Sequence, residues 1–475
     1  MVEKKQLFFY ALGAIEVGVQ SMRFLLSGAI IIGLAGCTLN DFDQIAKRPL
    51  SLMPGDFMGN TKPENAAQPL NKILIASKAS VDIQNGFVSS VKNAVEADPN
   101  ILVAKSDYLA MLKSIDVTKS FKDFQVSGAV YGGIEDVSDN TKGIAVVLNA
   151  SKMVYDGGQL DSQISSEELA AQAAFNNYLV KLDERTLEAT QVWVEFDRYS
   201  TLVNLIDSRL AVLDPLIKQL EKIAEAGLGD VSQVAAAQRT VAMIEVTQMD
   251  VEQRLEQAKV NFENFYGNLP PPSQFESKMI EQQVPQKISE DLVLKAPAIK
   301  AQYAAYRSAL AGLSAVEARD SISVGFESKV QRPFGGSSYD SDESLGLVLS
   351  KTLYNGKKLS SEIAQARERA NLQLESLRAV HRTGARTIET ALQTINSMDK
   401  AILLAQENAV NSNDEISYLR KQLIIGQSTL DSVLSAEARL YEAESKEINF
   451  KAERLNAQLG LLAALGLLSD TFKIQ

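Results

Sequence analysis

The sequence contains a single cysteine, Cys37, and a single histidine, His381, among its 475 residues. A disulfide framework, a zinc site of cysteine and histidine ligands, and a nucleophile activated by histidine all need partners that this inventory lacks. The glycine pairs in the chain are not followed by the lysine and hydroxyl residue of a phosphate-binding loop. We therefore expect no enzyme activity, no cofactor and no metal, and we expect His381 to be a packing or surface residue of a helix.

Basic residues are outnumbered, since 48 lysines and arginines face 59 aspartates and glutamates, which leaves a net charge of −11. A chain with this balance is not expected to bind nucleic acid or another polyanion. Proline and glycine are not enriched, with 12 and 27 residues, so the chain is not a low-complexity or collagen-like polymer.

The cysteine follows an apolar run near the start of the chain. In MRFLLSGAIIIGLAGC, which begins at Met22, a basic residue precedes an apolar core, and Leu-Ala-Gly precedes Cys37. This pattern resembles a bacterial lipobox, in which the cysteine thiol is acylated. The sequence thus predicts a lipoprotein signal peptide over residues 1–36, with Met22 as an alternative start, and a polar tether over residues 37–75. An ordinary secretory signal and a single membrane anchor are the alternatives, although the apolar core is short for a membrane span.

Two similar stretches lie 199 residues apart, since VYDGGQLDSQI begins at Val154 and LYNGKKLSSEI at Leu353 (353 − 154 = 199). The same offset pairs residues far downstream: Gly227 with Gly426, Val234 with Val433, and Ala237 with Ala436. A spacing kept over this length without net insertion or deletion indicates a duplicated unit of fixed size. We predict a first repeat over residues 76–275 and a second over residues 276–475.

Each repeat shows the same order of predicted elements. A helix of about thirty residues, with an early proline at Pro99 or Pro297, precedes two strands. A helix of up to about seventy residues follows, over residues 157–226 and 356–425, and a glycine-containing turn then leads to a return helix. Apolar residues on the long helices step by three and four, which is the pattern of a coiled-coil seam. In the first repeat this seam comprises Ile206, Leu210, Leu213, Ile217, Leu220 and Ala224.

The strands of the second repeat alternate strictly between apolar and small polar residues. The apolar positions of the two segments are Ile322, Val324, Phe326, Leu345, Leu347 and Leu349. Strands of this pattern form a sheet with one apolar and one wet face. The stretch RPFGGSSYDSDE between them is predicted to be a loop. Two hairpins per chain leave unpaired edges, so further strands must come from elsewhere.

Taken together, these features resemble the TolC-like outer-membrane channel family over about residues 76–468. The resemblance rests on the lipobox, the duplicated unit, the VYDGG and LYNGK turns, and above all on YLRKQLIIGQSTLDSVLSAEARLYEAE at the last turn. It implies an α+β fold of mostly long α-helices, in a homotrimer whose β-barrel takes four strands from each chain and continues into an α-helical coiled-coil barrel. It also implies a lipid-anchored protein of the bacterial outer membrane that extends into the periplasm, with the apolar strand residues facing lipid.

The resemblance further implies sites at the two helical turns, which would lie at the tunnel entrance. The residues expected to contact a periplasmic adaptor are Gly227, Val234, Ala237, Gly426, Val433 and Ala436, of which Val433 and Ala436 are expected to be exposed until the adaptor covers them. The alternative is that these residues only close the helical hairpins. Two aspartates that members of the family often carry after the second glycine are Ser432 and Ser435 here, so Asp431 and Glu437 could supply the entrance charge.

The function implied by the resemblance is that of a passive exit duct, recruited by an inner-membrane transporter and its periplasmic adaptor. The tip sequence GQSTLDSVLSAE and the ending LLAALGLL favour type I secretion of an adhesin or RTX-like protein through an ABC transporter. Efflux of drugs or other small molecules is the alternative within the family. A lipid-anchored structural coiled coil of the envelope would also show heptads and a lipobox, but it has no use for alternating hairpins.

Overall fold

The computed structural model describes residues 86–136, 141–225, 231–270, 275–285, 287–425 and 427–474. The predicted signal peptide and tether, including Cys37, lie outside the described residues. Ala79–Gln475 form one compact unit, in which helices of the two predicted repeats pack against each other.

The helix that leads into each pair of strands begins at a proline, and in the first repeat a shorter helix precedes it. In the first repeat α4 spans Phe87–Glu96 and α5 spans Pro99–Ser120, and in the second repeat α10 spans Pro297–Glu317. A proline is tolerated in the first turn because its missing N–H would have no helical acceptor there. Asp98 completes the start of α5, where its carboxylate accepts a hydrogen bond from the N–H of Asn100 at 2.8 Å. The prediction of longer helices that run through the prolines is therefore wrong, because each proline starts a new helix.

The four strands form one antiparallel sheet in the order β1-β2-β3-β4. Their bounds are Gln125–Asp136, Thr141–Tyr155, Ser323–Phe334 and Asp342–Ser350. β3 continues through Arg332 and Pro333, which were predicted to lie in a loop, because these residues pair with Val146 and Ala145 of β2. Ile322, predicted as the first apolar residue of the strand, lies one residue before β3.

The long helices have equal lengths in the two repeats. α6 (Gln159–Glu225) and α11 (Lys358–Ile424) each contain 67 residues, and α7 (Val231–Tyr266) and α12 (Leu430–Leu465) each contain 36. The offset of 199 holds at the start of both helix pairs, since 358 − 159 and 430 − 231 both equal 199. The prediction of two long helices of equal size is confirmed.

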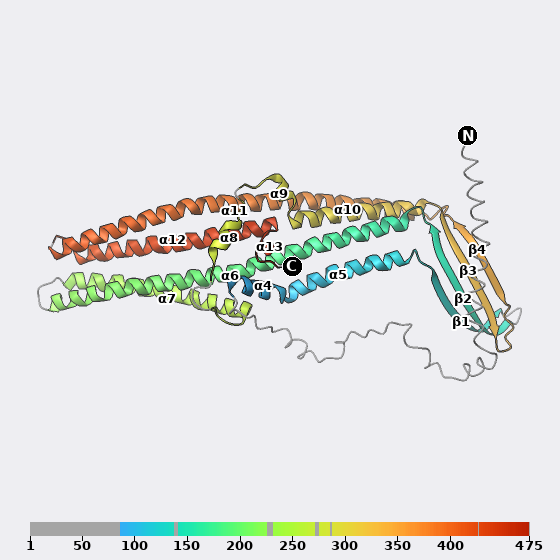
Figure 1. The fold of residues 1–475 in the computed structure, drawn as a ribbon, viewed down its shortest axis with the longest axis horizontal. Coiled ribbons are helices and arrows are strands. Elements are labelled where there is room, and N and C mark those ends of the chain that lie inside the picture. The colour runs from blue at the N-terminus through green and yellow to red at the C-terminus, as the bar shows by residue number, and fades with distance from the viewer. Residues whose placement is uncertain are drawn as a thin grey trace. The chain divides into compact units, whose positions relative to one another are not determined.

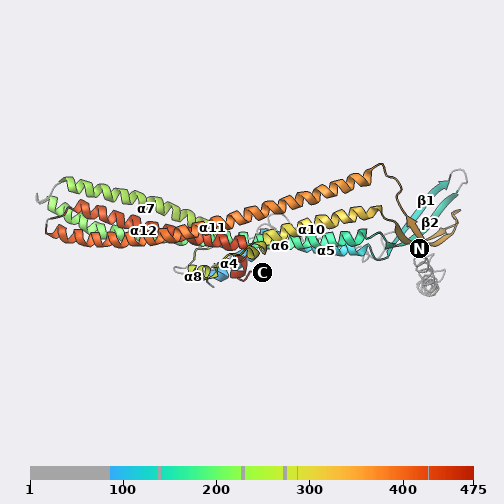
Figure 2. The same ribbon diagram turned by 90° about the horizontal axis from the view of Figure 1, so that it is seen from above.

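The helices lie side by side in an order that continues the order of the strands (Figures 1 and 2). Near the sheet the neighbours run α5, α6, α10, α11, and towards the helical turns they run α7, α6, α12, α11. The first repeat therefore contributes one side of the unit, with β1, α5 and α7 outermost. The second repeat contributes the other side, with β4 and α11 outermost.

Two apolar cores hold these helices together. Towards the turns, α6, α7 and α12 share a seam that contains Leu202, Ile206, Leu213, Ile244, Val251, Leu430, Val433 and Leu434. The predicted seam is confirmed at Ile206 and Leu213, whereas the side chains of Ile217, Leu220 and Ala224 lie outside the described residues. Midway along α6, Trp193 is 1% exposed and centres a second core, to which α4, α7, α12 and α13 (Leu468–Thr471) contribute.

The short helices α8 (Ser277–Gln283) and α9 (Glu290–Leu294) connect the two repeats. Ile280 of α8 is fully buried in the core around Trp193, and Leu292 of α9 packs on a smaller cluster formed by α11 and α12. The connection between the repeats is thus fixed against the long helices.

Candidate functional site

The largest exposed apolar side chains of the helices lie on the outermost helices. None of the described large apolar residues of α6, α10 and α12 is more than 50% exposed. The large apolar residues of the described helices that are between 60 and 71% exposed belong to α5, α7 and α11: Val103, Val117, Met243, Val246, Met249, Leu372, Leu403, Leu404, Val410 and Tyr418. Exposed apolar side chains on the same side of a unit mark a candidate interaction surface. We call the two sides that carry them the first-repeat edge (β1, α5, α7) and the second-repeat edge (β4, α11).

Where the second hairpin meets the helices, the sheet has one apolar and one polar face. Cross-strand partners point to the same face, and Leu349 pairs with Val324 while Leu347 pairs with Phe326. On the other face Ser350 pairs with Ser323. The predicted apolar alternation is thereby confirmed for both strands of the second repeat, and Leu345, Leu347 and Leu349 are 57 to 68% exposed. That this face meets lipid remains a prediction.

The residues predicted at the helical turns separate into two groups. Gly227 and Gly426, and the side chains of Val234 and Ala237 on α7, lie outside the described residues. Val433 and Ala436 of α12 are described and are fully buried. Val433 belongs to the seam with α6, and Ala436 packs with Ile416 and Leu440. The expectation that these two side chains are exposed is wrong, because Val433 packs against α6 and α7 and Ala436 packs against α11.

Glu437 is a charged residue inside the helical seam. It is 3% exposed, and its Oε1 lies 2.6 Å from Nη2 of Arg420 on α11. Its Oε2 lies 3.6 Å from Nη1 of Arg209 on α6, which also pairs with Glu444 of α12. The prediction that Glu437 supplies an exposed entrance charge is wrong, because the carboxylate is enclosed by these arginines. The pairs link α12 to both α6 and α11.

Asp431 is exposed in the first turn of α12, where a negative charge suits the helix dipole. Thr429 caps the same helix, since its Oγ1 accepts a hydrogen bond from the N–H of Ser432 at 3.3 Å.

Sequence reasoning missed the pairing of Arg209 with Glu437. The signal was present, because a glutamate in an apolar heptad stripe requires a buried partner.

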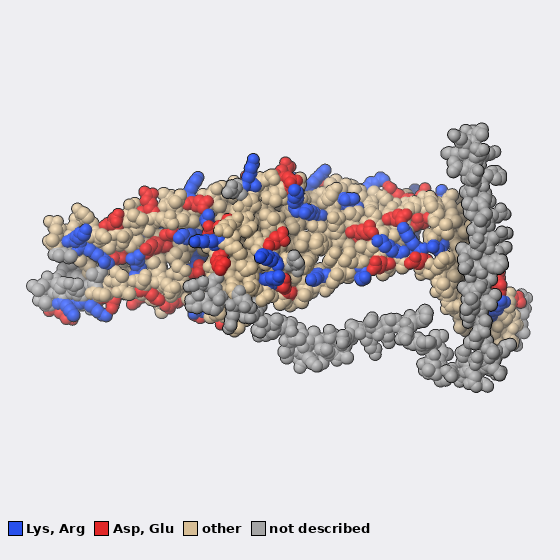
Figure 3. All heavy atoms as spheres, in the orientation of Figure 1, with Lys and Arg blue, Asp and Glu red and all other residues tan. Residues whose placement is uncertain are grey.

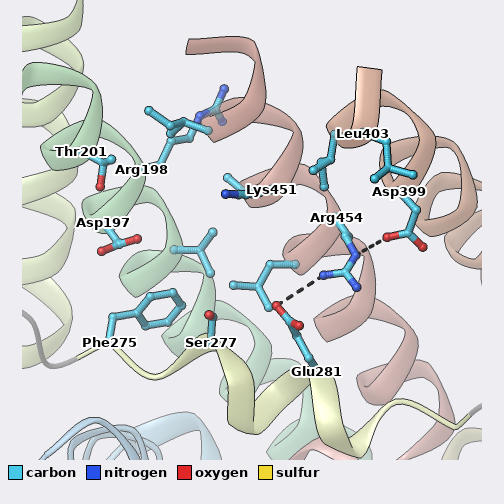
Figure 4. A pocket seen from close by; sticks show the side chains of 15 residues that line it. Asp197, Arg198, Thr201, Phe275, Ser277, Glu281, Asp399, Leu403, Lys451 and Arg454 are labelled. Carbon is cyan, nitrogen blue, oxygen red and sulfur yellow. Dashed lines mark ion pairs between the residues drawn. The ribbon is translucent and has the colours of Figure 1, made fainter. Parts of the chain in front are cut away.

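A cavity of about 660 Å³ opens between α6, α8, α11 and α12 (Figure 4). At its wall Nε of Arg454 lies 2.6 Å from Oδ1 of Asp399, and Nη1 lies 3.3 Å from Oε1 of Glu281. Arg198 and Lys451, which also line it, pair with Glu195 and Glu447. The basic groups of the cavity are thus already matched by acids of the chain. The two pairs of Arg454 link α12 to α8 and to α11.

Among the described residues, no three histidine, cysteine or carboxylate side chains are grouped closely enough to hold a metal ion. His381 is half-buried on α11. On the face drawn in Figure 3, acidic and basic side chains are interspersed along the helices. None of the helices in the described part of the chain combines the length and apolar character that a membrane span requires.

Comparisons with known proteins find similar sequences and a similar fold. The family described as "Outer membrane efflux protein" matches residues 288–467. Outer membrane protein TolC of Escherichia coli (strain K12) is 21% identical over 358 residues, which cover 70% of this chain and 71% of that protein. The solved structure of CusC superposes with a TM-score of 0.70 at 16% identity, covering 81% of this chain and 93% of that chain. VceC of Vibrio cholerae gives a TM-score of 0.67 at 14% identity, covering 79% and 95%.

Proposed function

The chain is a TolC-like outer-membrane efflux protein, and on this premise we propose that three copies close into a channel that serves as the exit duct of a tripartite export system. The family is one of channel proteins and not of enzymes. The observation that carries the proposal is the placement of exposed apolar side chains on the two edges of the unit. A single chain leaves both edges open, and a ring of identical chains covers the first-repeat edge of one copy with the second-repeat edge of the next.

The sheet supports the same proposal. β1 and β4 each have one strand neighbour within the described chain, and an exposed strand edge is a template for pairing with another chain. In lipid every backbone polar group needs a partner, so strands span a membrane only in a closed barrel. Three chains would supply twelve strands, with Leu345, Leu347 and Leu349 towards lipid. The polar face would line the duct.

The mass and conductance of the purified protein test the closed channel. We expect light scattering in detergent to give three chains per particle, and planar bilayers to show discrete channels.

Leu347→Arg and its first-repeat counterpart Leu148→Arg should each destabilise the assembly by roughly 2–4 kcal/mol, because each places a charge on the lipid face. Ser350→Arg, on the other face, should be tolerated. Equal losses at Leu347 and Ser350 would contradict the assignment of the faces.

Within this function we propose type I secretion of an adhesin or RTX-like protein, with an ABC transporter in the inner membrane and a periplasmic adaptor. The tip sequence GQSTLDSVLSAE and the ending LLAALGLL support this branch. A deletion strain should lack one large protein from its culture medium or cell surface, as measured by mass spectrometry of the secreted fraction. An unchanged secreted fraction would contradict the assignment.

Small-molecule efflux is the second candidate, and the name of the matching family favours it. In that case the deletion strain should become more sensitive to antibiotics, dyes or metal salts while its secreted proteins stay the same. Both measurements on one strain, with the wild-type gene restored as a control, separate the two candidates. A structural coiled coil of the envelope predicts neither change.

We also propose that the two helical turns contact the adaptor, through residues that include Gly227, Val234, Ala237 and Gly426. Because Ala436 is fully buried, Ala436→Glu should reduce the yield of assembled protein. Ser435 is its exposed neighbour, so Ser435→Glu should leave the yield unchanged and reduce export. Normal export with Ser435→Glu would argue against docking at this turn.

The lipid anchor at Cys37 remains part of the proposal. Mass spectrometry of the purified protein should find an acylated amino terminus at Cys37, since the lipobox pattern directs acylation of that thiol. An unmodified amino terminus at another residue would contradict it.

A further inference from the structure

The two β-hairpins of the chain match each other residue by residue. In the first, Gln125 pairs with Ser151, and in the second Ser323 pairs with Ser350. An offset of 198 relates β1 to β3 (323 − 125 = 198), and an offset of 199 relates β2 to β4 (350 − 151 = 199). The internal repeat therefore extends to hydrogen-bond register, and a contact seen on one hairpin can be transferred to the other.

Within the chain, the first hairpin meets the second through β2 and β3. Ala150 pairs with Ser328 and Leu148 with Val330, and the pairing shifts at a bulge between Met153 and Tyr155. The hinge that follows β2 is also closely packed against the second repeat. A Cβ added to Gly157 would lie 2.2 Å from Cβ of Ser321, and Gly157 has a φ of 71°. Glycine is required at this hinge by both the contact and the backbone conformation.

The equivalent hinge after β4 is open. Gly356 has a φ of 65°, but a Cβ added to it would meet nothing within 4 Å. The preceding residues Leu353 and Tyr354 are 90% and 84% exposed. The second hinge thus keeps the glycine of the first without the contact that accompanies it, and in the described chain β4 has no neighbour on its outer side.

We propose that β4 of one copy pairs with β1 of a second copy in the register that the β2–β3 pairing transfers. Ala150 corresponds to Leu349 (150 + 199) and Ser328 to Val130 (328 − 198), so Leu349 lies opposite Val130 of the second copy. Ser350 lies opposite Ala129 and Leu347 opposite Gly132 of that copy by the same arithmetic. The open hinge at Gly356 rests on the second copy near Asp123, the counterpart of Ser321 (321 − 198 = 123). This register rests on the proposed closed channel and specifies how its edges meet.

The side chains that this register brings together are compatible. Leu349 and Val130 both belong to the apolar face, as their pairing with Val324 and Val146 shows. On the other face Val348 lies opposite Tyr131, and both are exposed in the single chain. A slip by one residue would set apolar-face positions of one strand against polar-face positions of the other. The transferred register therefore keeps each face uniform across the junction.

Paired cysteines test the register in the full-length protein. Directly opposite residues have Cβ atoms about 4.5–5.5 Å apart, diagonal neighbours about 7–8 Å, and a disulfide needs about 3.8 Å. We expect Leu349→Cys with Val130→Cys, or the adjacent Ser350→Cys with Ala129→Cys, to give covalent dimers and trimers under mild oxidation. Two pairs are used because successive antiparallel pairs alternate between closer and wider spacing. The diagonal pair Leu347→Cys with Val130→Cys should give at least five-fold less.

The matched control is the β2–β3 pairing within one chain, from which the register was transferred. Ala150→Cys with Ser328→Cys should cross-link within one chain and give no larger species on a denaturing gel. Each single-cysteine variant shows whether Cys37 takes part. If light scattering finds trimers but the diagonal pair cross-links better than both direct pairs, the register is wrong and the closed channel stands. If no variant and no wild-type sample forms an oligomer, the proposed channel itself fails.

Discussion

The long helices of the two repeats have the same lengths and share a polar contact, but they have different surroundings. Nε2 of Gln248 donates to Oδ1 of Asp207 at 2.8 Å, and Nε2 of Gln406 donates to Oε1 of Glu447 at 2.8 Å. The offset relates Asp207 to Gln406 and Gln248 to Glu447 (207 + 199 = 406; 248 + 199 = 447), so donor and acceptor have exchanged helices while the bond persists. By contrast, α6 is enclosed by helices of both repeats, and α11 borders an edge. The position of a contact along the helix is therefore the same in both repeats, whereas the burial of a residue depends on which helices surround it.

The largest effect should come from Trp193, the largest fully buried side chain of the described residues, which is replaced by leucine in the second repeat. Trp193 is 1% exposed, and its ring centroid lies 5.2 Å from that of Phe87 and 4.9 Å from that of Phe262. Its counterpart in the second repeat is Leu392 (193 + 199 = 392), which is half-buried. Trp193→Ala should lower the free energy of unfolding by about 3–5 kcal/mol because of the cavity it leaves. Leu392→Ala should cost less than half as much.

Denaturant titration of the purified protein, followed by circular dichroism, measures both changes. Fluorescence is unsuitable because Trp193 is the single tryptophan of the chain. Equal losses for the two variants would mean that the second repeat has a core of the same strength, against the difference in burial.

The next largest effect concerns Glu437, a buried charge at a position where the first repeat has an uncharged residue. Glu437 contacts Arg209 and Arg420, whereas its counterpart Gln238 (437 − 199 = 238) is exposed. Breaking a fully buried pair costs roughly 3–5 kcal/mol. Arg420 is 42% exposed and Arg209 keeps Glu444, so Glu437→Ala should cost about 2 kcal/mol, below that range. Gln238→Ala, the matched control, should change stability by less than about 0.5 kcal/mol. Stability unchanged by Glu437→Ala would show that the cluster does not hold α12 to α6.

Sequence alone predicted the parts that depend on spacing. The offset of 199 gave the equal helices, and the alternation around Leu347 gave the two faces of the sheet. The heptad pattern also identified the seam at Ile206. It did not reveal that Val433 and Ala436 are buried. A heptad pattern indicates which side of a helix packs, but it does not indicate how many helices pack against that side. α6 of the other repeat covers Val433 through contacts that are distant in sequence, and α11 covers Ala436.

A smaller effect distinguishes the repeats by pH. Asp183 of α6 is 2% exposed, and burial raises its pKa to about 6, although Oδ1 accepts a hydrogen bond from the N–H of Ser469 at 2.8 Å. Asp470, on the same short helix α13, adds repulsion that raises the pKa further. The counterpart in the second repeat is Arg382 (183 + 199 = 382), which is exposed. Only the first repeat therefore carries a buried carboxyl at this level.

The sign of the effect follows from the two pKa values. The folded protein retains the Asp183 proton up to about pH 6, whereas the unfolded chain loses it near the ordinary value of 3.8. The folded state binds more protons in between, so its stability should increase by about 1 kcal/mol as the pH falls from about 7 to about 5. Asp183→Asn should remove this increase, since the amide does not titrate. Denaturant titrations at both pH values measure it, and a wild-type protein that loses stability at the lower pH would contradict the assignment.

The smallest effect should separate the two hinges. After β2, Asp156 accepts hydrogen bonds from the N–H groups of Gly158 at 2.9 Å and Leu160 at 2.7 Å. After β4, its counterpart Asn355 (156 + 199 = 355) accepts one long bond of 3.4 Å from the N–H of Leu359. Loss of a side chain that caps a helix start costs about 1 kcal/mol. Asp156→Ala should therefore destabilise the detergent-solubilised protein by about 1 kcal/mol and Asn355→Ala by a few tenths.

The hinge comparison also probes assembly. If a second copy covers the open hinge at Gly356, the Asn355 side chain becomes enclosed, and its bond to Leu359 should gain importance in the trimer. We therefore expect the two alanine variants to differ most in protein held as monomers by denaturing detergent and to differ less in intact trimers. Thermal melts of each variant in both states measure this. A gap between the variants that is the same in monomer and trimer would mean that the second hinge stays exposed to solvent after the chains assemble.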